Sequence, residues 1–363
     1  MTTNLLLVVG MEHFIKKCTY ISEAARLKGL ATTFITADKS GHSNATVAIY
    51  DGAEVIVRRG VVRRYLVFVK ILIAKRPLSV QVYDTGLLTL FYVVSSRLFC
   101  DDVVLFLRGG EFSVLTLRRK VRVGALWLCA KISHRVLVKE ENLRLSAKKL
   151  GITNAKLSLV GNSVQIHEPV KKLVASDRAI DVLFCNSLTA MRNPDFIVEF
   201  LKRFLAQCPE AKIVIAGIHS LARSGGAPYD ASIELEFVRQ VRLIDKHKAI
   251  ELRGFVENPD ELYNRSKIFI LPADVVYANY SCLEAMAAGV IPVVSQGEGA
   301  EILVPHDVGF SLPLDPVLWS HKISALLANE NELDRMRPAV LAHIEKNHSI
   351  AAWAEAVFNS ERP

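Results

Sequence analysis

Short apolar runs rich in β-branched residues alternate with helical patterns along the whole chain, and this alternation limits the possible folds more than any other feature. Each run has four to six residues, which are nearly all apolar. The predicted strands lie at residues 5–9, 32–36, 54–57, 79–83, 103–107, 135–138, 156–160, 180–185, 211–216, 249–253, 268–271, 291–295 and 309–312. Apolar strands separated by helices are typical of parallel sheets covered on both faces. The pattern therefore predicts an α/β chain built from doubly wound, Rossmann-like parallel sheets.

The length of 363 residues is too great for one compact core, so two domains are expected. The alternation is interrupted near residues 167–176, where a His-Glu-Pro sequence begins a mixed polar stretch. We predict a basic N-terminal Rossmann-like domain at residues 1–170 and a second one at residues 171–345, facing each other across a cleft. A final helix within residues 346–363 has no strand after it, and we expect it to pack back towards the N-terminal domain.

Positive charge is concentrated in the first half of the chain. Residues 1–170 hold 25 Lys and Arg against 12 Asp and Glu, whereas residues 171–363 hold 20 against 25. The cations cluster among apolar side chains at residues 58–76 and 118–131. This combination suits the anionic surface of an inner membrane, and we expect peripheral membrane association. Nucleic acid is not an expected partner, because no binding motif accompanies the charge. The alternative is a pair of ordinary crossover helices with a solvated basic face.

Other patterns exclude some classes of protein. No stretch approaches the ~18–20 apolar residues that a transmembrane helix needs. The apolar residues 5–9 are too few for a signal-peptide core, and no basic region precedes them. The six cysteines are far apart and include no C-x-x-C pair, so they are interpreted as buried thiols in a reducing compartment. These features predict a cytoplasmic protein.

The most informative segment is residues 268–295, where an apolar strand is followed by a loop, a helix starting near Ser281 and a second strand. Asn279, Tyr280 and Ser281 lie where a helix N-terminus would present backbone N–H groups to an anion such as a diphosphate. Glu284 lies one turn further on, where its carboxylate could accept hydrogen bonds from ribose hydroxyls. The alternative is a capping box, in which Glu284 binds the backbone N–H of Ser281.

The sequence LEAMAAGVIPVV at residues 283–294 resembles the signature of the retaining glycosyltransferases of family four (bacterial glycosyltransferase group 1), which have the GT-B fold. Further segments follow in the order of that family: KLSLVGNSVQIHEP (156–169), DVLFCNSLTAMRNPDFIVE (181–199), KIVIAG (212–217) and LRGFVENPDELYNRSKIFILP (252–272). The resemblance implies a hexosyltransferase-type enzyme that moves a sugar from a nucleotide-sugar donor to a membrane-associated glycan or lipid-linked acceptor. It also implies bacterial lipopolysaccharide or surface polysaccharide synthesis, with no metal or other cofactor.

The resemblance assigns roles to individual residues. Glu284 matches the second of two family glutamates, which binds the nucleotide ribose. The first glutamate falls at Val276, or at Ala278 if two residues are deleted, and neither residue is acidic. Asp274 lies nearby and is the candidate to substitute for it.

The family also places an arginine and, five residues later, a lysine on the donor diphosphate. Ser187 and Arg192 occupy these positions. Arg192 can bind a phosphate bidentately, whereas Ser187 offers only a hydroxyl. The catalytic candidates are therefore Arg192, Glu284 and Asp274. The donor-binding candidates are Gly10, Ser187, Arg192, Gly217, Phe255, Asn279, Tyr280, Ser281 and Glu284.

The acceptor-binding candidates follow two strands of the first domain. Arg108, Gly109, Gly110 and Glu111 come directly after an apolar strand, at the expected ligand edge. The family often has a histidine-glycine pair near this place, and Arg108 in its stead suits an acceptor phosphate. The alternative is that Arg108 and Glu111 pair with each other to fix a loop. Asp84, at the end of the preceding predicted strand, is the fifth candidate.

Two other functions are left open by the departures at residues 187 and 276. A GT-B nucleotide-sugar epimerase would keep the donor site without transferring the sugar. A catalytically silent partner would bind a sugar nucleotide and dock on an active transferase. Nucleotide binding without turnover would favour the silent partner, and a changed donor without an acceptor would favour the epimerase.

Overall fold

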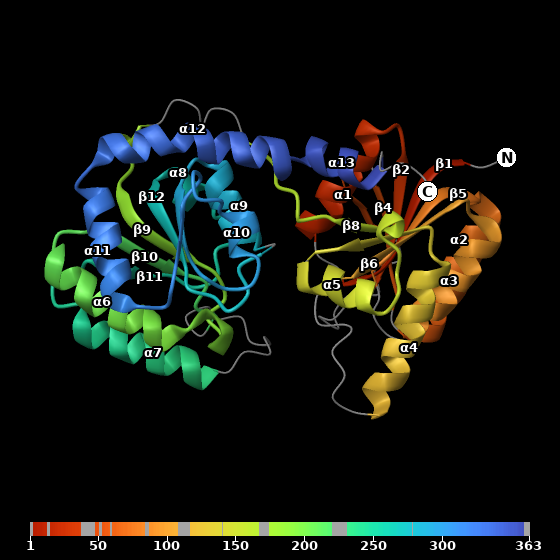
Figure 1. Cartoon of the computed structure of the whole chain (residues 1–363), viewed down its shortest axis with the longest axis horizontal. Helices are drawn as coiled ribbons and strands as arrows, with labels where there is room; N and C mark the ends of the chain where they lie inside the picture. The colour runs from red at the N-terminus through yellow and green to blue at the C-terminus, as the bar shows by residue number, and fades with distance from the viewer. Residues whose placement is uncertain are drawn as a thin grey trace. The chain divides into compact units, whose positions relative to one another are not determined.

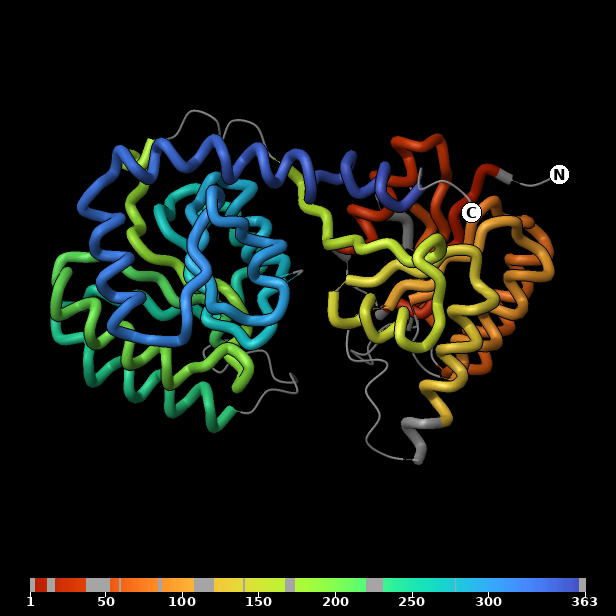
Figure 2. The backbone as a smooth tube through the Cα atoms, viewed as in Figure 1, coloured from red at the N-terminus to blue at the C-terminus, as the bar shows by residue number. Residues whose placement is uncertain are grey.

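The computed structural model describes residues 3–12, 15–37, 48–50, 53–58, 60–83, 87–107, 117–139, 141–166, 174–219, 231–277 and 279–358. The chain divides into two compact units. Unit 1 is Met1–Ser163 together with Ile350–Pro363, and unit 2 is Val164–Ser349. The chain therefore passes between the units twice (Figure 2). The first passage lies just before the predicted stretch 167–176, and the second assigns the C-terminal helix to unit 1.

Within the described residues, unit 1 contains an eight-stranded sheet. Its strands are β1 (Thr3–Glu12), β2 (Ala31–Ala37), β3 (Ala48–Tyr50), β4 (Ala53–Val57), β5 (Pro77–Val82), β6 (Asp102–Leu107), β7 (Arg135–Val138) and β8 (Leu157–Leu159). Its helices are α1 (Ile15–Leu27), α2 (Val61–Lys75), α3 (Leu88–Phe99), α4 (Leu117–Ile132), α5 (Glu141–Lys149), η1 (Asn154–Lys156) and α13 (Ile350–Phe358).

The strand order of unit 1 is β3-β4-β2-β1-β5-β6-β7-β8. All neighbouring strands are parallel except β3 and β4, which are antiparallel. Without β3 this is the Rossmann order, and the direction of winding changes between β1 and β5. Strand β3 was not predicted from the sequence, because a strand of three residues is too short to show a period.

Unit 2 has a six-stranded sheet in its described residues. Its strands are β9 (Ile180–Cys185), β10 (Ile213–Ala216), β11 (Ile250–Leu252), β12 (Ser266–Leu271), β13 (Ile291–Ser295) and β14 (Phe310–Leu312). Its helices are η3 (Ala175–Asp177), η4 (Ala190–Arg192), α6 (Pro194–Gln207), α7 (Ala231–Ile244), α8 (Asp260–Asn264), α9 (Tyr280–Ala287), α10 (Ala300–Leu303), α11 (Pro316–Leu327) and α12 (Glu330–Asn347).

The order β11-β10-β9-β12-β13-β14 is fully parallel and is again the Rossmann order. The winding reverses between β9 and β12. Ligands of such sheets bind outside the carboxyl ends of the strands at this switch point. The predicted α/β class with two Rossmann-like parallel-sheet units is confirmed, with the antiparallel β3 as an addition. The predicted cleft between the units stays a prediction.

The two faces of the unit 1 sheet are covered differently. Helices α2, α3 and α4 lie side by side along one face (Figure 1). Phe68 of α2 and Tyr92 of α3 belong to the apolar core on that face, together with alternate strand residues such as Val80 and Val103. The intervening residues point to the other face, because side chains alternate along a strand. Helix α13 packs against α1 and belongs to that second face.

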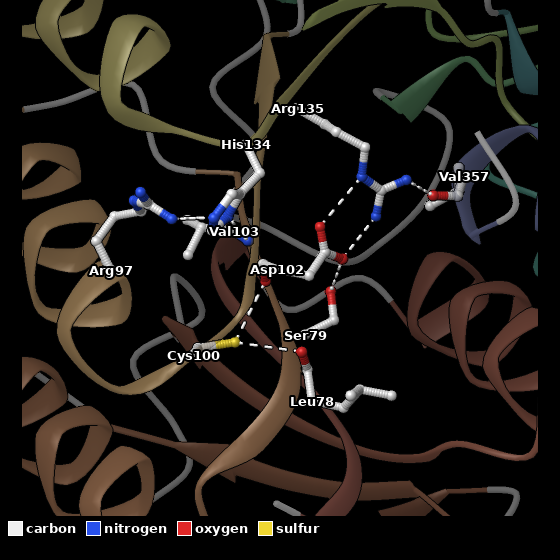
Figure 3. A network of polar contacts seen from close by, with 9 residues as sticks. All are labelled: Leu78, Ser79, Arg97, Cys100, Asp102, Val103, His134, Arg135 and Val357. Carbon is white, nitrogen blue, oxygen red and sulfur yellow. Dashed lines mark hydrogen bonds and ion pairs between the residues drawn. The ribbon is translucent and has the colours of Figure 1, made fainter. Parts of the chain in front are cut away.

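A buried polar network joins the second face to α13 (Figure 3). Arg135 of β7 donates from Nη2 to Asp102 Oδ2 at 2.6 Å and from Nε to Oδ1 at 3.1 Å. Ser79 Oγ donates to the same carboxylate at 2.7 Å. Arg135 Nη1 donates to the backbone oxygen of Val357, in the last turn of α13. Because the last carbonyls of a helix lack partners within the helix, this contact fixes the C-terminal end of α13.

The ring of Trp353 in α13 is stacked near Phe106 of β6, with 6.2 Å between the centroids. In the described part of the chain, no helix combines the length and the apolar character needed to cross a bilayer.

Candidate functional site

The loop after β12 is held in place by the loop after β13. Val276 N donates to Glu298 O at 3.1 Å, and Glu298 N donates to Asp274 O at 2.9 Å. The two loops approach so closely that a Cβ atom on Gly297 would lie 2.4 Å from Ala273 O. Only glycine fits at that position. The backbone at the switch-point edge is therefore fixed before any ligand binds.

Two of the predicted site residues meet where the loop after β9 contacts the loop after β12. Asp274 Oδ1 accepts a hydrogen bond from Asn193 Nδ2 at 3.0 Å, and Asp274 N donates to Met191 O at 3.1 Å. Arg192 Nη1 donates to Val275 O at 3.2 Å. Burial lowers the pKa of Arg192, and the carboxylate of Asp274 partly offsets this effect. The structure thus places Arg192 and Asp274 on two loops that contact each other, and their catalytic roles stay predictions.

The position that corresponds to the first family glutamate holds no acidic residue. Val276 is fully buried within unit 2, so its side chain contributes only to packing. Ala278 lies outside the described residues. The side chain of Asp274 is exposed on the same loop. That Asp274 takes over the role of the missing glutamate stays a prediction.

Ser187 is connected to Phe255 through a histidine that the sequence analysis missed. Ser187 Oγ lies 3.1 Å from His219 Nε2, within hydrogen-bond distance. The His219 ring stacks near the exposed ring of Phe255, with 5.8 Å between their centroids. The position of His219 after β10, at the ligand edge of the sheet, was the only available signal for it.

Gly217 has a structural reason to be glycine. Its φ of +97° lies in the region that favours glycine, and a Cβ atom there would lie 2.2 Å from Asn186 O. Its N–H donates to Gly254 O at 3.0 Å. Gly217 therefore lets the loops after β9 and β10 approach each other at the predicted donor site.

Helix α9 begins one residue earlier than predicted, and this removes one alternative. Asn279 is its N-cap, and Asn279 Oδ1 accepts from Cys282 N at 3.0 Å. Ser281 is then the second residue of the helix and Glu284 the fifth. The capping-box interpretation of Ser281 and Glu284 is wrong, because a capping box needs the serine at the N-cap.

The carboxylate of Glu284 is oriented by a tyrosine from another helix. Tyr263 of α8 donates from its hydroxyl to Glu284 Oε2 at 3.2 Å. Burial raises the pKa of Tyr263 well above its usual value, and the nearby Cys185 and Glu284 raise it further. Tyr263 therefore keeps its proton at neutral pH and acts as a donor. Tyr263 was not predicted from the sequence, since nothing in the local pattern links residues 263 and 284.

Two buried arginines hold the other end of α9. Arg178 donates from Nη2 to Ala288 O at 2.7 Å and from Nη1 to Ser266 O at 2.7 Å. Arg337 Nε donates to Gly289 O at 3.1 Å. Burial, followed by the charge of Arg337, lowers the pKa of Arg178 to about 10. Positive charge stabilises the C-terminal end of a helix, so both ends of α9 are fixed.

Of the six candidates in unit 1, the structure describes Gly10. Gly10 was predicted to follow the first strand, but β1 continues to Glu12. Gly10 has a φ of +79°, and the pairing of β1 with β2 shifts register between Val9 and Glu12, so Gly10 lies in an irregular strand end. The five acceptor candidates lie outside the described residues: Asp84, Arg108, Gly109, Gly110 and Glu111.

Residues 165–341 match the sequence model of a family described as glycosyl transferases group 1. The chain therefore carries a group 1 glycosyltransferase domain over these residues. The resemblance seen in the sequence is thereby confirmed. A search of curated protein sequences finds no significant match to this glycosyltransferase.

Several solved structures share the fold of this glycosyltransferase. A glycosyltransferase from Rickettsia africae has a TM-score of 0.73 at 10% identity, covering 97% of this chain and 96% of that chain. Sucrose-phosphate synthase from Thermosynechococcus elongatus has a TM-score of 0.71 at 14% identity, with 96% of each chain covered. Anabaena HepE in complex with UDP has a TM-score of 0.72 at 12% identity, with 99% of each chain covered. At these identities the likeness shows the GT-B fold.

Over the residues that the structure describes, no group of three or more His, Cys, Asp or Glu side chains is placed to hold a metal ion. That the glycosyltransferase needs no cofactor stays a prediction.

Proposed function

We propose that this enzyme transfers a sugar, with retention of anomeric configuration, from a nucleotide-sugar donor to a membrane-associated glycan or lipid-linked acceptor. We place the reaction at the cytoplasmic face of the inner membrane, in bacterial lipopolysaccharide or surface polysaccharide synthesis. The observation that carries the proposal is the position of Glu284 and the start of α9 at the switch point of the unit 2 sheet, where Rossmann-like sheets bind nucleotides.

The diphosphate is assigned to the start of α9. Backbone N–H groups of a first helical turn and the helix dipole favour an anion there. Arg192 is held against the loop that leads into α9 by its bond to Val275 O, and its guanidinium suits bidentate phosphate binding. Fixed donors of this kind stabilise the charge that develops on a leaving diphosphate without reorganising during the reaction.

The nucleoside is assigned to Glu284 and Phe255. The Glu284 carboxylate accepts hydrogen bonds from ribose hydroxyls while the Tyr263 hydroxyl holds its orientation. The exposed Phe255 ring, backed by His219, offers a surface on which a base can stack. Asp274 is assigned to the transferred sugar.

Uracil is the first base to test. Anabaena HepE has been solved with UDP-glucose, and Staphylococcus aureus TarM with UDP. The acceptor roles of Asp84 and of Arg108 to Glu111 stay predictions.

Calorimetry with UDP, GDP and CMP, followed by a donor-consumption assay, tests the proposal. We expect one nucleotide to bind and the matching sugar nucleotide to be consumed only when a lipid-linked acceptor is present. Binding without turnover on any acceptor would instead indicate a catalytically silent partner. Conversion of the donor without an acceptor would indicate an epimerase, and the absence of nucleotide binding would overturn all three functions.

A further inference from the structure

Helices α2, α3 and α4 of unit 1 form a continuous surface. Tyr65 of α2 and Phe91 of α3 are in edge contact, with 5.9 Å between their ring centroids, and a hydrogen bond of 2.7 Å joins Tyr65 Oη to Ser95 Oγ. Helix α3 also packs against α4. We call the outward-facing side chains of these three helices the α2–α4 surface; the helices themselves are shown in Figure 1.

Large apolar side chains are concentrated on the α2–α4 surface. Among the described residues, twelve of the twenty-three exposed large apolar side chains lie on these helices or at their caps. They are Val61, Val62, Leu66, Ile73, Leu87, Phe91, Val94, Leu98, Phe99, Val121, Trp127 and Leu128. Contiguous exposed apolar surface of this kind marks an interaction site.

Helix α3 carries the apolar centre of the surface. Four apolar residues of this segment follow one another at intervals of four, three and four positions: Leu87, Phe91, Val94 and Leu98. This spacing places them on one helical stripe. Phe91 is 56% exposed and Leu98 is 73% exposed. The stripe lies opposite the residues of α3 that enter the core, so folding of unit 1 leaves it uncovered.

Cations are interleaved with these apolar side chains. Cationic and apolar residues alternate along one helical stripe of α2: Arg63, Leu66, Lys70 and Ile73. All four are exposed. The three helices together contain ten Lys and Arg and no Asp or Glu. Lys75 at the end of α2 pairs with Glu54 of β4 at 3.0 Å, but the excess of cations over the three helices attracts an anionic partner and repels a basic one.

The helices of unit 2 show that this pattern does not follow from the fold. In α6, Arg203 pairs with Glu199 at 2.7 Å, and in α7, Arg239 pairs with Glu236 at 2.6 Å. These pairs balance the charge within each helix. Helix α7 also exposes apolar side chains, but its acids accompany them.

We propose that the α2–α4 surface docks on an anionic lipid bilayer, with the stripe of α3 entering the boundary between head groups and acyl chains and the cations contacting lipid phosphates. A bilayer interface offers apolar depth and negative charge within ~5–10 Å of each other, which suits interleaved apolar and basic side chains. A protein interface typically has an apolar centre depleted of charge. This inference deepens the proposed function, since it rests on a membrane-bound acceptor and names the surface that meets the membrane.

The test is co-sedimentation of the full chain with phosphatidylcholine vesicles, with and without phosphatidylglycerol, at low and high salt. We expect binding only to vesicles with phosphatidylglycerol, and weaker binding at high salt because surface charges are screened. The variant R63E/K70E should lower the partition coefficient at least about tenfold, since each cation near an anionic surface contributes to binding. The variant L66S/F91S/L98S should also lower it at least about tenfold, by removing apolar area.

Matched control variants are available in unit 2. Leu235 and Leu243 of α7 are 61% and 65% exposed, so L235S/L243S removes apolar area of similar exposure. K202E/R203E changes two exposed cations of α6. Both control variants should bind vesicles as the unchanged protein does.

Three results would overturn the inference. The first is no binding of the unchanged protein to anionic vesicles, and the second is equal loss in the control variants. The third is a concentration-dependent dimer that the unchanged protein forms and the F91S variant does not, which would assign the surface to a second copy of the chain. Calorimetry with UDP on the same proteins separates the hypotheses. If the unchanged protein binds UDP but not anionic vesicles, this inference alone fails. If it binds anionic vesicles but not UDP, the proposed donor site alone fails.

Discussion

The two units share the Rossmann strand order but place their charges differently. In unit 2 exposed cations pair with acids of the same helix, and two buried arginines bind carbonyl groups at the end of α9. In unit 1 the helices α2, α3 and α4 carry no acids, and the buried charges form the pair of Asp102 and Arg135. The shared strand order therefore leaves the placement of charges free to differ between the units. The following predictions test this difference, from the largest expected effect to the smallest.

The buried ion pair of unit 1 should contribute far more to stability than the exposed pairs of unit 2. Asp102→Ala leaves the buried Arg135 without its carboxylate and should lower the free energy of unfolding by about 3–5 kcal/mol. Glu199→Ala removes an exposed pair of α6 and should cost less than about 1 kcal/mol.

The fluorescence of the three tryptophans can assign these changes to a unit during urea unfolding. Trp319 lies in unit 2, and the other two lie in unit 1, so a Trp319→Phe background reports unit 1 alone. Equal losses in the two variants would show that the pair in unit 1 is not the stronger determinant of stability.

The nucleotide site should depend on the switch-point residues of unit 2. Glu284→Ala should raise the nucleotide dissociation constant about tenfold or more, because a charged hydrogen bond contributes about 1.5–3 kcal/mol. Calorimetry measures this change, and Glu261→Ala on the exposed side of α8 is the control. If Glu284→Ala lowers the melting temperature but leaves the affinity unchanged, the role of Glu284 is structural.

Tyr263→Phe should have a smaller effect on the same site. The loss of the hydroxyl that orients Glu284 should raise the dissociation constant about two- to tenfold, or about 0.5–1.5 kcal/mol. In the Glu284→Ala background the same substitution should add nothing, since the two residues then no longer interact. Additive effects in this double-mutant cycle would mean that Tyr263 acts independently of Glu284.

The smallest expected effect is the loss of unit 1 stability at mildly acidic pH. Burial, followed by the charge of Arg97, lowers the pKa of His134 in unit 1, and His134 Nδ1 accepts a hydrogen bond from Val103 N at 2.8 Å. The unfolded chain therefore binds a proton at a higher pH than the folded unit does. Stability from this group is complete above the ordinary histidine pKa of about 6.5 and is lost as the pH falls below it.

His134→Gln should flatten the pH dependence of the unit 1 unfolding transition between neutral pH and mild acid. The unit 2 transition should stay unchanged and keep its own acid sensitivity, because burial also lowers the pKa of His343 there. A change in both transitions would show that the two units do not unfold independently.

The strands could be predicted because the strands of a covered parallel sheet are almost wholly apolar, and every predicted strand overlaps an observed one. Strand β3 was missed because it has three residues and pairs by a short antiparallel contact. At the candidate site, the resemblance to the family assigned roles to Glu284 and Arg192, and Asp274 was proposed as an acid near the position of the missing glutamate; these roles stay predictions. Tyr263 was not predicted, because its contact with Glu284 spans 21 positions and leaves no local pattern.

The basic character of residues 58–76 could also be predicted from the sequence, but the contribution of α3 to the α2–α4 surface could not. Helix α3 has a single cation, Arg97, so charge clustering does not reveal it. Its exposed stripe becomes evident only when the opposite side of the helix is seen to enter the core.

The assignment of α13 to unit 1 has a consequence for how the protein is made. Residues 164–349 are translated between the two parts of unit 1, so the guanidinium of Arg135 cannot reach the Val357 carbonyl until the ribosome has read through all of unit 2. Domains generally fold in order as the nascent chain emerges, the N-terminal one first. In this protein unit 1 lacks its last helix until unit 2 has been synthesised. Unit 2 is therefore the first unit whose whole sequence is available for folding.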